Sequence, residues 1–232
     1  MSETPQKNPS KTGAVTFLDV LGWKGMWLLH ENPIPALLKV VERTREEATK
    51  ISKQYAETKE FRGIENITEV ISISDTIAIF SEGETELTIE LQAKICSWLL
   101  EHALSEEKIP LRGAISYGSY SKLDNVMQGR AVDEAASWYE FVDWIGVVLT
   151  PSAHLKISQK KSITECITHY EKIPFKKSVP NLNTCVDWNF NAKMKKLEEI
   201  VVEMGVLTPE IAPKYLNTLA FLNRKKSNRK KT

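Results

Sequence analysis

Ala14-Val15-Thr16-Phe17-Leu18-Asp19-Val20-Leu21-Gly22 is an apolar, β-branched and aromatic run that includes one carboxylate near its end. Val70-Ile71-Ser72-Ile73-Ser74-Asp75-Thr76-Ile77-Ala78-Ile79-Phe80 places its own aspartate between two apolar runs. These patterns predict buried strands, and Ser74-Asp75 predicts the tight turn of a hairpin. A carboxylate beside a buried strand is costly to keep charged unless something compensates it. Two converging aspartates could hold Mg²⁺ or Mn²⁺, although spacing alone leaves open that Asp19 and Asp75 never meet.

The composition indicates one large domain with appendages. The chain has 232 residues, of which 42% are hydrophobic, and a formal net charge of +1. Six of the last nine residues are Lys or Arg. We therefore expect a disordered arm over residues 1–12 and a basic disordered tail over 224–232, with no nucleic-acid partner.

The cysteines and the apolar runs predict the location of the protein. Cys96, Cys166 and Cys185 are odd in number and widely spaced, without a CxxC pattern, which is typical of reduced thiols. The first 12 residues form no signal peptide. No apolar run approaches the ~20 residues that span a bilayer. We expect a cytoplasmic protein without a membrane segment.

The order of predicted elements favours an α+β fold. Strands are expected over 14–19, 67–73, 76–80, 111–116, a hairpin over 118–127, and then 145–149, 170–175 and 185–188. Helices are expected near Gly22 and Gly25, and over 35–59, 86–104, 129–142, 151–157, 190–204 and 209–222. Strands that pair as hairpins with helices between them indicate a mixed, mostly antiparallel sheet with helices on its faces. In such a ferredoxin-like arrangement the first strand lies beside the following hairpin, and Asp19 would face Asp75.

Four segments resemble the catalytic domain of class III nucleotide cyclases. They are 17–22, 61–67 leading into 73–76, the Arg-x-Gly strand 111–118, and 129–135 at the place of a Gly-x-x-Val-Asn-x-Ala helix start. Each is weak alone, but the four occur in the family's order. The resemblance spans about residues 14–188 and implies a cyclase domain over 13–188, followed by a helical extension over 189–223.

The departures from the family pattern concern the base and the transition state. Ile71 and Val126 stand where purine cyclases have a base-reading lysine and aspartate. Asp133 and Ser137 stand where the family has an asparagine and an arginine that steady the ribose and the transition state. This combination resembles the bacterial antiphage pyrimidine cyclases of the Pycsar type. It implies conversion of UTP, or less readily CTP, to the 3′,5′-cyclic monophosphate and pyrophosphate, as an alarm for a separate effector.

Two alternatives stay open at this point. One is a purine cyclase with altered base contacts, and the other is a catalytically inactive cyclase-like module that binds nucleotide. For a pyrimidine ring, Ser72, Ser74 and Gln128 are the expected polar contacts.

The resemblance also implies roles for individual residues. Asp19, Asp75 and the Val20 carbonyl would hold two divalent ions, Mn²⁺ or Mg²⁺, which activate the ribose 3′-hydroxyl and neutralise the triphosphate. Arg130 or Arg112 would replace the missing transition-state arginine, although Arg112 could instead pair structurally with an acid. The active sites would lie at the interface of a homodimer. The expected triphosphate contacts are Phe17, Leu21, Gly22, Trp23 and Lys176.

Overall fold

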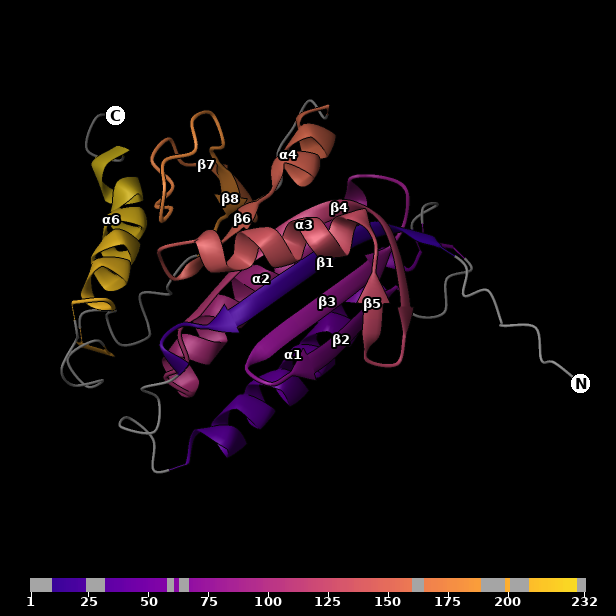
Figure 1. Ribbon diagram of the computed structural model, residues 1–232, viewed down its shortest axis with the longest axis horizontal. Coiled ribbons are helices and arrows are strands. Elements are labelled where there is room, and N and C mark those ends of the chain that lie inside the picture. Colours follow the sequence, from indigo (N-terminus) through magenta and orange to yellow (C-terminus); the bar gives the residue numbers. More distant parts are fainter. Residues whose placement is uncertain are drawn as a thin grey trace, which may run out of the picture.

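One central sheet carries helices on both faces (Figure 1). The computed structural model describes residues 10–23, 32–57, 61–62, 67–159, 165–188, 199–200 and 209–228. The strands are β1 (Lys11–Val20), β2 (Thr68–Ile73), β3 (Thr76–Glu82), β4 (Leu111–Leu123), β5 (Val126–Gln128), β6 (Gly146–Leu149), β7 (Ile167–His169) and β8 (Thr184–Val186). The helices are α1 (Pro33–Tyr55), α2 (Leu87–Glu106), α3 (Arg130–Trp138), α4 (Pro151–Ser158) and α6 (Ala212–Asn228), with a 3₁₀ turn η2 (Tyr139–Phe141).

The sheet is mixed and mostly antiparallel, as the sequence predicts. Its strand order is β2-β3-β1-β4-β6-β8-β7, and β5 pairs with β4 outside this path. Only β4 and β6 run parallel among the described strand pairs. The α+β prediction, with the first strand between its neighbours and the hairpin at its side, is confirmed.

β1 is apolar throughout because both of its faces are covered. Leu18 and Val20 belong to the core under α1 and α2, whereas Val15 and Phe17 pack on the opposite face under α3. Figure 1 shows α3 in front of the sheet, with α1 and α2 behind it. Since side chains alternate along a strand, Asp19 follows Phe17 on the α3 face.

A buried glutamine fixes α2 to the sheet. Gln92 is fully buried, and its Nε2 donates to the carbonyls of Ala14 (2.8 Å) and Ile79 (3.0 Å). Its Oε1 accepts a hydrogen bond from the buried Thr16 hydroxyl. A buried amide is tolerated when its donors and acceptor are satisfied in this way, so the network sets the position of α2 against β1 and β3.

Several predicted boundaries are wrong. The strand predicted over 170–175 lies earlier, at Ile167–His169, because the chain turns after Tyr170 and Pro174 has no N–H to donate to a ladder. The strand predicted to end at 116 continues as β4 to Leu123, and α3 ends at Trp138 before the η2 turn. Gly22 lies in a turn, and the rest of the helix predicted near Gly22 and Gly25 falls outside the described residues. So does most of the helix predicted over 190–204.

The sequence predicts a basic disordered tail from residue 224, but α6 continues to Asn228. Arg224 is part of the fold: its Nη2 lies 2.7 Å from Asp187 Oδ1, and its guanidinium carbon lies 3.4 Å from the centre of the Phe221 ring. A buried acid near β8 therefore holds the end of α6. No helix of the described residues has the length and apolar character that crossing a bilayer requires.

Replacing Arg224 by methionine should lower the free energy of unfolding by about 2–3 kcal/mol, because Asp187, whose side chain is only 8% exposed, loses its ion pair with the Arg224 guanidinium. Urea unfolding measures the change. Arg43→Met is the control, since the Arg43–Glu46 pair is exposed on α1 and should contribute less than ~1 kcal/mol. Equal effects of the two substitutions would contradict this role of Arg224.

Candidate active site

The structure brings Asp19 and Asp75 together at one end of the sheet. The register of β1 and β3 sets Asp19 opposite Thr76, the residue after Asp75. The Val20 N–H donates to the Asp75 carbonyl over 3.3 Å. The hairpin turn is tight because Ser74 adopts a left-handed conformation with φ of 57°. The predicted convergence of the two aspartates therefore follows from the pairing of β1 with β3.

Arg112, at the start of β4, holds Asp19 from the other side. Its Nη2 and Nε donate to Asp19 Oδ2 over 3.0 and 3.3 Å. Its Nη1 donates to the carbonyls of Glu140 (3.0 Å) and Val142 (3.2 Å). The Arg112 and Asp19 side chains are only 12% and 15% exposed. From the sequence, Arg112 could either act on the transition state or pair with an acid. The structure shows that it pairs with Asp19, the first of the two predicted metal ligands.

Gly113 allows this approach of β4 to β1. A Cβ at Gly113 would lie 2.5 Å from the Phe17 carbonyl oxygen, so a larger residue would push the two strands apart. The glycine of the Arg-x-Gly segment thus fixes the strand spacing that lets Arg112 reach Asp19.

The neighbouring acids make this end of the sheet electrostatically costly. Burial raises the pKa of the Asp19 carboxyl, Arg112 opposes the rise, and the Asp75 and Glu140 carboxylates add to it. Burial, with the Glu140 and Asp19 carboxylates, also raises the pKa of Tyr139 to about 12. Tyr139 is therefore a protonated donor near neutral pH, and its hydroxyl lies 3.1 Å from Glu140 Oε1.

The donors available here fit a hard divalent cation. Among the described residues, none donates a hydrogen bond to Asp19 Oδ1 or to the Asp75 carboxylate. Two neighbouring carboxylates with free oxygens suit Mg²⁺ or Mn²⁺, which need only one or two protein carboxylates when phosphate supplies further ligands. The described residues contain no cluster of three or more His, Cys, Asp or Glu side chains placed for a metal. Substrate oxygens and backbone carbonyls, such as that of Val20, would have to complete the coordination.

The predicted triphosphate contacts differ in what they can offer. Phe17 and Leu21 have buried side chains, so only their backbone groups could reach a ligand. Gly22 has φ of 83° in the turn after β1, and the partly buried Trp23 packs against the core. Lys176 is exposed, and its N–H donates to the Phe141 carbonyl over 3.0 Å. Lys176 therefore lies on a loop beside the segment that holds Arg112.

Arg130, in contrast, lies far from Asp19 of the same chain. It is exposed at the start of α3, and a Cβ on Gly118 would lie 3.8 Å from Arg130 Cβ. Gly118 pairs with Gly13, six residues before Asp19 on β1, which corresponds to ~20 Å along the strand. Of the two candidate arginines, Arg112 contacts Asp19 within one subunit and Arg130 does not.

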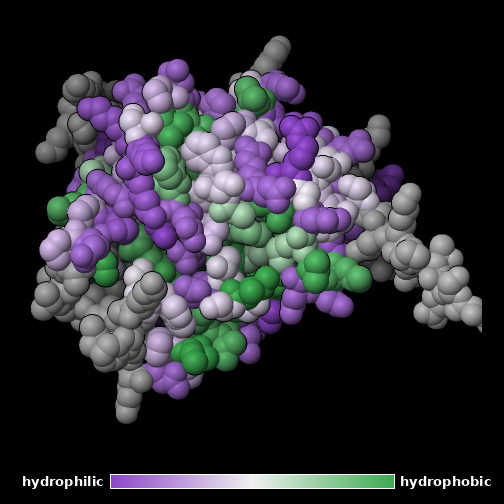
Figure 2. Space-filling model, viewed as in Figure 1, coloured by the Kyte–Doolittle hydropathy of each residue, from purple (hydrophilic) through white to green (hydrophobic). Residues whose placement is uncertain are grey.

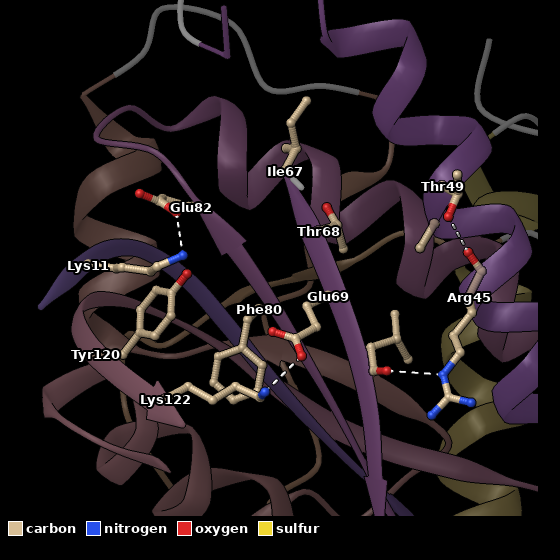
Figure 3. A pocket seen from close by; sticks show the side chains of 12 residues that line it. Lys11, Arg45, Thr49, Ile67, Thr68, Glu69, Phe80, Glu82, Tyr120 and Lys122 are labelled. Carbon is tan, nitrogen blue, oxygen red and sulfur yellow. Dashed lines mark hydrogen bonds and ion pairs between the residues drawn. The ribbon is translucent and has the colours of Figure 1, made fainter. Parts of the chain in front are cut away.

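A separate cavity of about 480 Å³ lies toward the other end of β1, around the edge strand β2 (Figure 3). Lys122 Nζ and Glu69 Oε1 are 2.7 Å apart there, and Lys11 Nζ and Glu82 Oε2 are also 2.7 Å apart. The rings of Phe80 and Tyr120, with centroids 5.4 Å apart, form apolar surface beneath them. The cavity therefore combines ring surface with adjacent donors and acceptors. On its outer side, Arg45 Nε donates to the Val70 carbonyl over 3.1 Å.

The expected base contacts do not share one face. Ile71 packs on the α3 face with Glu69, whereas Ser72 points to the opposite face by strand alternation. Gln128 is exposed on β5 opposite Ser121, and Ser74 is exposed in the turn. Sequence reasoning missed the Glu69–Lys122 pair, since its residues come from two strands that are not adjacent in the sheet.

Apolar side chains of β2, β4 and β5 are exposed on the α3 side of the sheet. Figure 2 shows this surface below α3. Ile73, Leu123 and Val126 are 43%, 64% and 74% exposed, and Ile71 and Met127 are partly buried beside them. Contiguous exposed apolar surface of this kind marks contact regions.

Comparisons with known proteins place the fold. No family model matches the sequence, and no curated protein matches it. Among solved structures, the catalytic core of a rhodopsin-guanylyl cyclase with converted specificity, in complex with ATPαS, is 12% identical; the match covers 78% of this chain and 96% of that one, with a TM-score of 0.51. A monomeric adenylate cyclase from Trypanosoma brucei is 13% identical, with coverages of 78% and 88% and a TM-score of 0.45. An adenylate/guanylate cyclase/hydrolase from Silicibacter pomeroyi is 16% identical, with coverages of 78% and 98% and a TM-score of 0.42.

The likeness to the guanylyl cyclase core extends over nearly all of that domain and most of this chain. The chain therefore has the fold of the class III cyclase catalytic domain, as its four segments predict.

Proposed function

We propose that this protein is a nucleotide cyclase that converts UTP, or less readily CTP, to the 3′,5′-cyclic monophosphate and pyrophosphate. The observation that carries the proposal is the pair of aspartates at the ends of β1 and β2, with the Arg112 guanidinium beside Asp19. No described residue donates a hydrogen bond to Asp19 Oδ1 or to the Asp75 carboxylate. This pair stands on a fold shared with nucleotide cyclases. The product would serve as a second messenger of bacterial antiphage defence, read by a separate effector, as the resemblance to the Pycsar type implies.

Asp19, Asp75 and the Val20 carbonyl would hold two divalent ions, Mn²⁺ or Mg²⁺. Bound there, the ions would lower the pKa of the ribose 3′-hydroxyl and neutralise charge on the triphosphate. Arg112 keeps Asp19 Oδ2 fixed, which leaves Oδ1 for a ligand. Lys176, on the adjacent loop, would attract the terminal phosphates. In this arrangement the aspartates would bind the metal ions, and the lysine would bind the phosphates.

The side chains on the α3 face of the sheet are the basis for proposing selectivity for pyrimidines. Ile71 and Val126 offer no polar group to a purine edge. The Glu69–Lys122 pair lies on the same face as Ile71 and sets a carboxylate 2.7 Å from an ammonium group. Because it lies toward the other end of β1 from Asp19, it would, like Arg130, serve the aspartates of the second subunit. An acceptor beside a donor matches the adjacent N–H and C=O groups of a uracil ring, and the Phe80 and Tyr120 rings would supply a stacking surface.

A homodimer would complete each active site. Arg130 lies ~20 Å along the sheet from Asp19 of its own chain, so it could act only on a site of the second subunit. The exposed apolar side chains of β2 and β5 offer surface for that contact. Isologous pairing of two such faces would form two equivalent sites.

The deciding experiment incubates the purified protein with Mn²⁺ or Mg²⁺ and each of UTP, CTP, ATP and GTP separately, followed by chromatography of the products. We expect a cyclic pyrimidine monophosphate, with ~10⁴-fold preference over purines, because a site with polar partners set for one base leaves them unpaired with another. Cyclic AMP or cyclic GMP as main product would assign a purine cyclase with altered base contacts, in keeping with the adenylate and guanylyl cyclases that share the fold. Nucleotide binding without any turnover would assign an inactive module.

A further inference from the structure

We infer that the C-terminal helix α6 is a positioning element of the aspartate site, and that Thr218 and Asn217 hold Asp19 in place through a chain of contacts. The inference concerns the regulation of the site and rests on the proposed function only for its metal-binding readout. It starts from residues 140–145, which lie between α6 on one side and Arg112 on the other.

α6 binds the second half of this segment through polar side chains. The Ile145 N–H donates to Thr218 Oγ1 over 2.9 Å, and Thr218 is fully buried. Asn217 Nδ2 donates to the Asp143 carbonyl over 2.8 Å, and Lys214 Nζ lies 3.5 Å from Asp143 Oδ1. Side chains of α6 thus satisfy backbone groups that have no strand partner before β6 begins at Gly146. A buried N–H without an acceptor is costly, so residues 143–145 depend on α6. Residues 141–143 are also held by the loop at Phe175, through the bonds from the Asp143 N–H to the Pro174 carbonyl and from the Lys176 N–H to the Phe141 carbonyl.

The first half of the segment binds the site. Glu140 and Val142 present their carbonyls to Arg112 Nη1, while the other two guanidinium nitrogens hold Asp19 Oδ2. All three nitrogens of Arg112 are therefore used. Moving residues 140–142 would move the guanidinium, and with it the carboxylate.

A second contact of α6 reaches the site more directly. Ile211, next to the first residue of α6, lies over the turn that follows Asp19 and Val20: a Cβ on Gly22 would be 3.2 Å from Ile211 Cδ1. The C-terminal region therefore touches the site at two places, the Gly22 turn and the segment that holds Arg112.

The apolar side of α6 fixes its position. Phe221 and Tyr215 are buried, and the Phe221 ring lies edge-on to the Trp144 ring with centroids 4.2 Å apart. Trp144 belongs to the same segment, between Asp143 and Ile145. Packing and hydrogen bonds of α6 thus converge on three consecutive residues, which makes this segment the route by which α6 acts on the site.

The test compares two matched threonines. Thr218 and Thr44 are both fully buried, and each hydroxyl donates to the carbonyl four residues earlier in its own helix. Only Thr218 also accepts from Ile145. Thr218→Val and Thr44→Val therefore remove the same group with the same helix bond, but only the first substitution removes the contact to the site.

The first readout is Mn²⁺ binding without nucleotide, followed by the electron paramagnetic resonance signal of free Mn²⁺. We expect Thr218→Val to weaken binding about tenfold, as loss of an outer support of a metal ligand does. Thr44→Val should bind like the wild type, and Thr218→Ser should restore affinity. Asp19→Asn should bind little, which shows that the signal comes from this site. Equal affinity of Thr218→Val and Thr44→Val would overturn the inference.

The second readout needs no metal. Amide hydrogen exchange of peptide 17–23 reports the Val20 and Leu21 N–H groups, which donate to the Asp75 and Pro110 carbonyls. Exchange there should be faster in Thr218→Val than in Thr44→Val or Thr218→Ser. Unchanged exchange would overturn the inference. Absence of Asp19-dependent Mn²⁺ binding in the wild type, with exchange changed as expected, would instead overturn the proposed function alone.

Discussion

Asp19→Asn and Asp75→Asn should each reduce cyclase turnover at least a hundredfold, a barrier increase of about 2.7 kcal/mol. Each substitution removes a charged oxygen ligand and leaves the volume of the side chain almost unchanged. Neither aspartate fills the core: Asp19 is partly exposed, and Asp75 lies in the hairpin turn. The loss should therefore appear in the rate of product formation and not in the circular dichroism spectrum.

Asp124→Asn is the matched control. Asp124 is an exposed residue in the turn between β4 and β5, with φ of 51°, a conformation that asparagine also tolerates. Its turnover should equal that of the wild type. If Asp19→Asn or Asp75→Asn kept more than about a tenth of the activity, a change of only ~1.4 kcal/mol, the two-metal assignment would be wrong.

Mixing Asp75→Ala subunits with Arg130→Ala subunits should restore activity that neither variant has alone. In the mixed dimer, the Arg130→Ala subunit supplies intact aspartates and the Asp75→Ala subunit supplies an intact Arg130, so one of the two sites is complete. If equal amounts of the two subunits pair at random, about half of the dimers are mixed, so about a quarter of all sites are complete. Co-expression with two affinity tags isolates the mixed dimer for the turnover assay.

The control for this experiment pairs Asp75→Ala with Asp19→Asn. Both substitutions fall in the acidic half of the site, so every site of the mixed dimer lacks one aspartate and should stay inactive. Sedimentation of a fully active monomer, or an Arg130→Ala protein with wild-type turnover, would contradict the shared site. The second outcome would leave Arg112 as the arginine candidate, since it meets Asp19 within one chain.

The sequence predicts the centre of the sheet well because burial on both faces leaves a clear mark. Residues 14–20 and 76–80 are apolar on both faces, and they form most of β1 and of β3. The edge strand β2 is only partly buried, but its own apolar residues still mark it. The position of Asp75 in the turn sets the register, and the register brings the two acids together. Local signals therefore suffice for this half of the site.

Contacts between distant segments could not be predicted in the same way. Arg112 has an ordinary strand sequence around it, and nothing local indicates that its partners are Asp19 and the carbonyls of Glu140 and Val142. The Tyr170–Phe175 stretch is rich in apolar residues, but these pack from a loop: Phe175 stacks near Phe141, with centroids 5.8 Å apart. Apolar content shows that a segment is buried, whereas the pairing of its backbone depends on neighbours far away in the sequence.

The role of α6 was hidden for a related reason. Its apolar residues predict a closing helix, but nothing in the sequence distinguishes Thr218 and Asn217 from other polar residues. Their role depends on hydrogen bonds to the backbone of Ile145 and Asp143, which lies outside the strands. The basic run after Phe221 suggested a solvated tail, yet Arg224 has a buried acid within reach. Composition alone cannot separate a basic residue of a tail from one that ends a docked helix.

The Arg45 hydrogen bond to the Val70 carbonyl has a consequence for how copies of the protein meet. β2 is the last strand on its side of the sheet, and an unpaired border strand invites extension of the sheet by another chain. A guanidinium placed on that border already occupies one of its carbonyls, and a second strand would have to displace it and bury its charge. Growth into fibrous aggregates is thereby disfavoured at this border. The exposed apolar side chains around Ile73, Leu123 and Val126 remain as a surface through which two molecules can form a closed dimer.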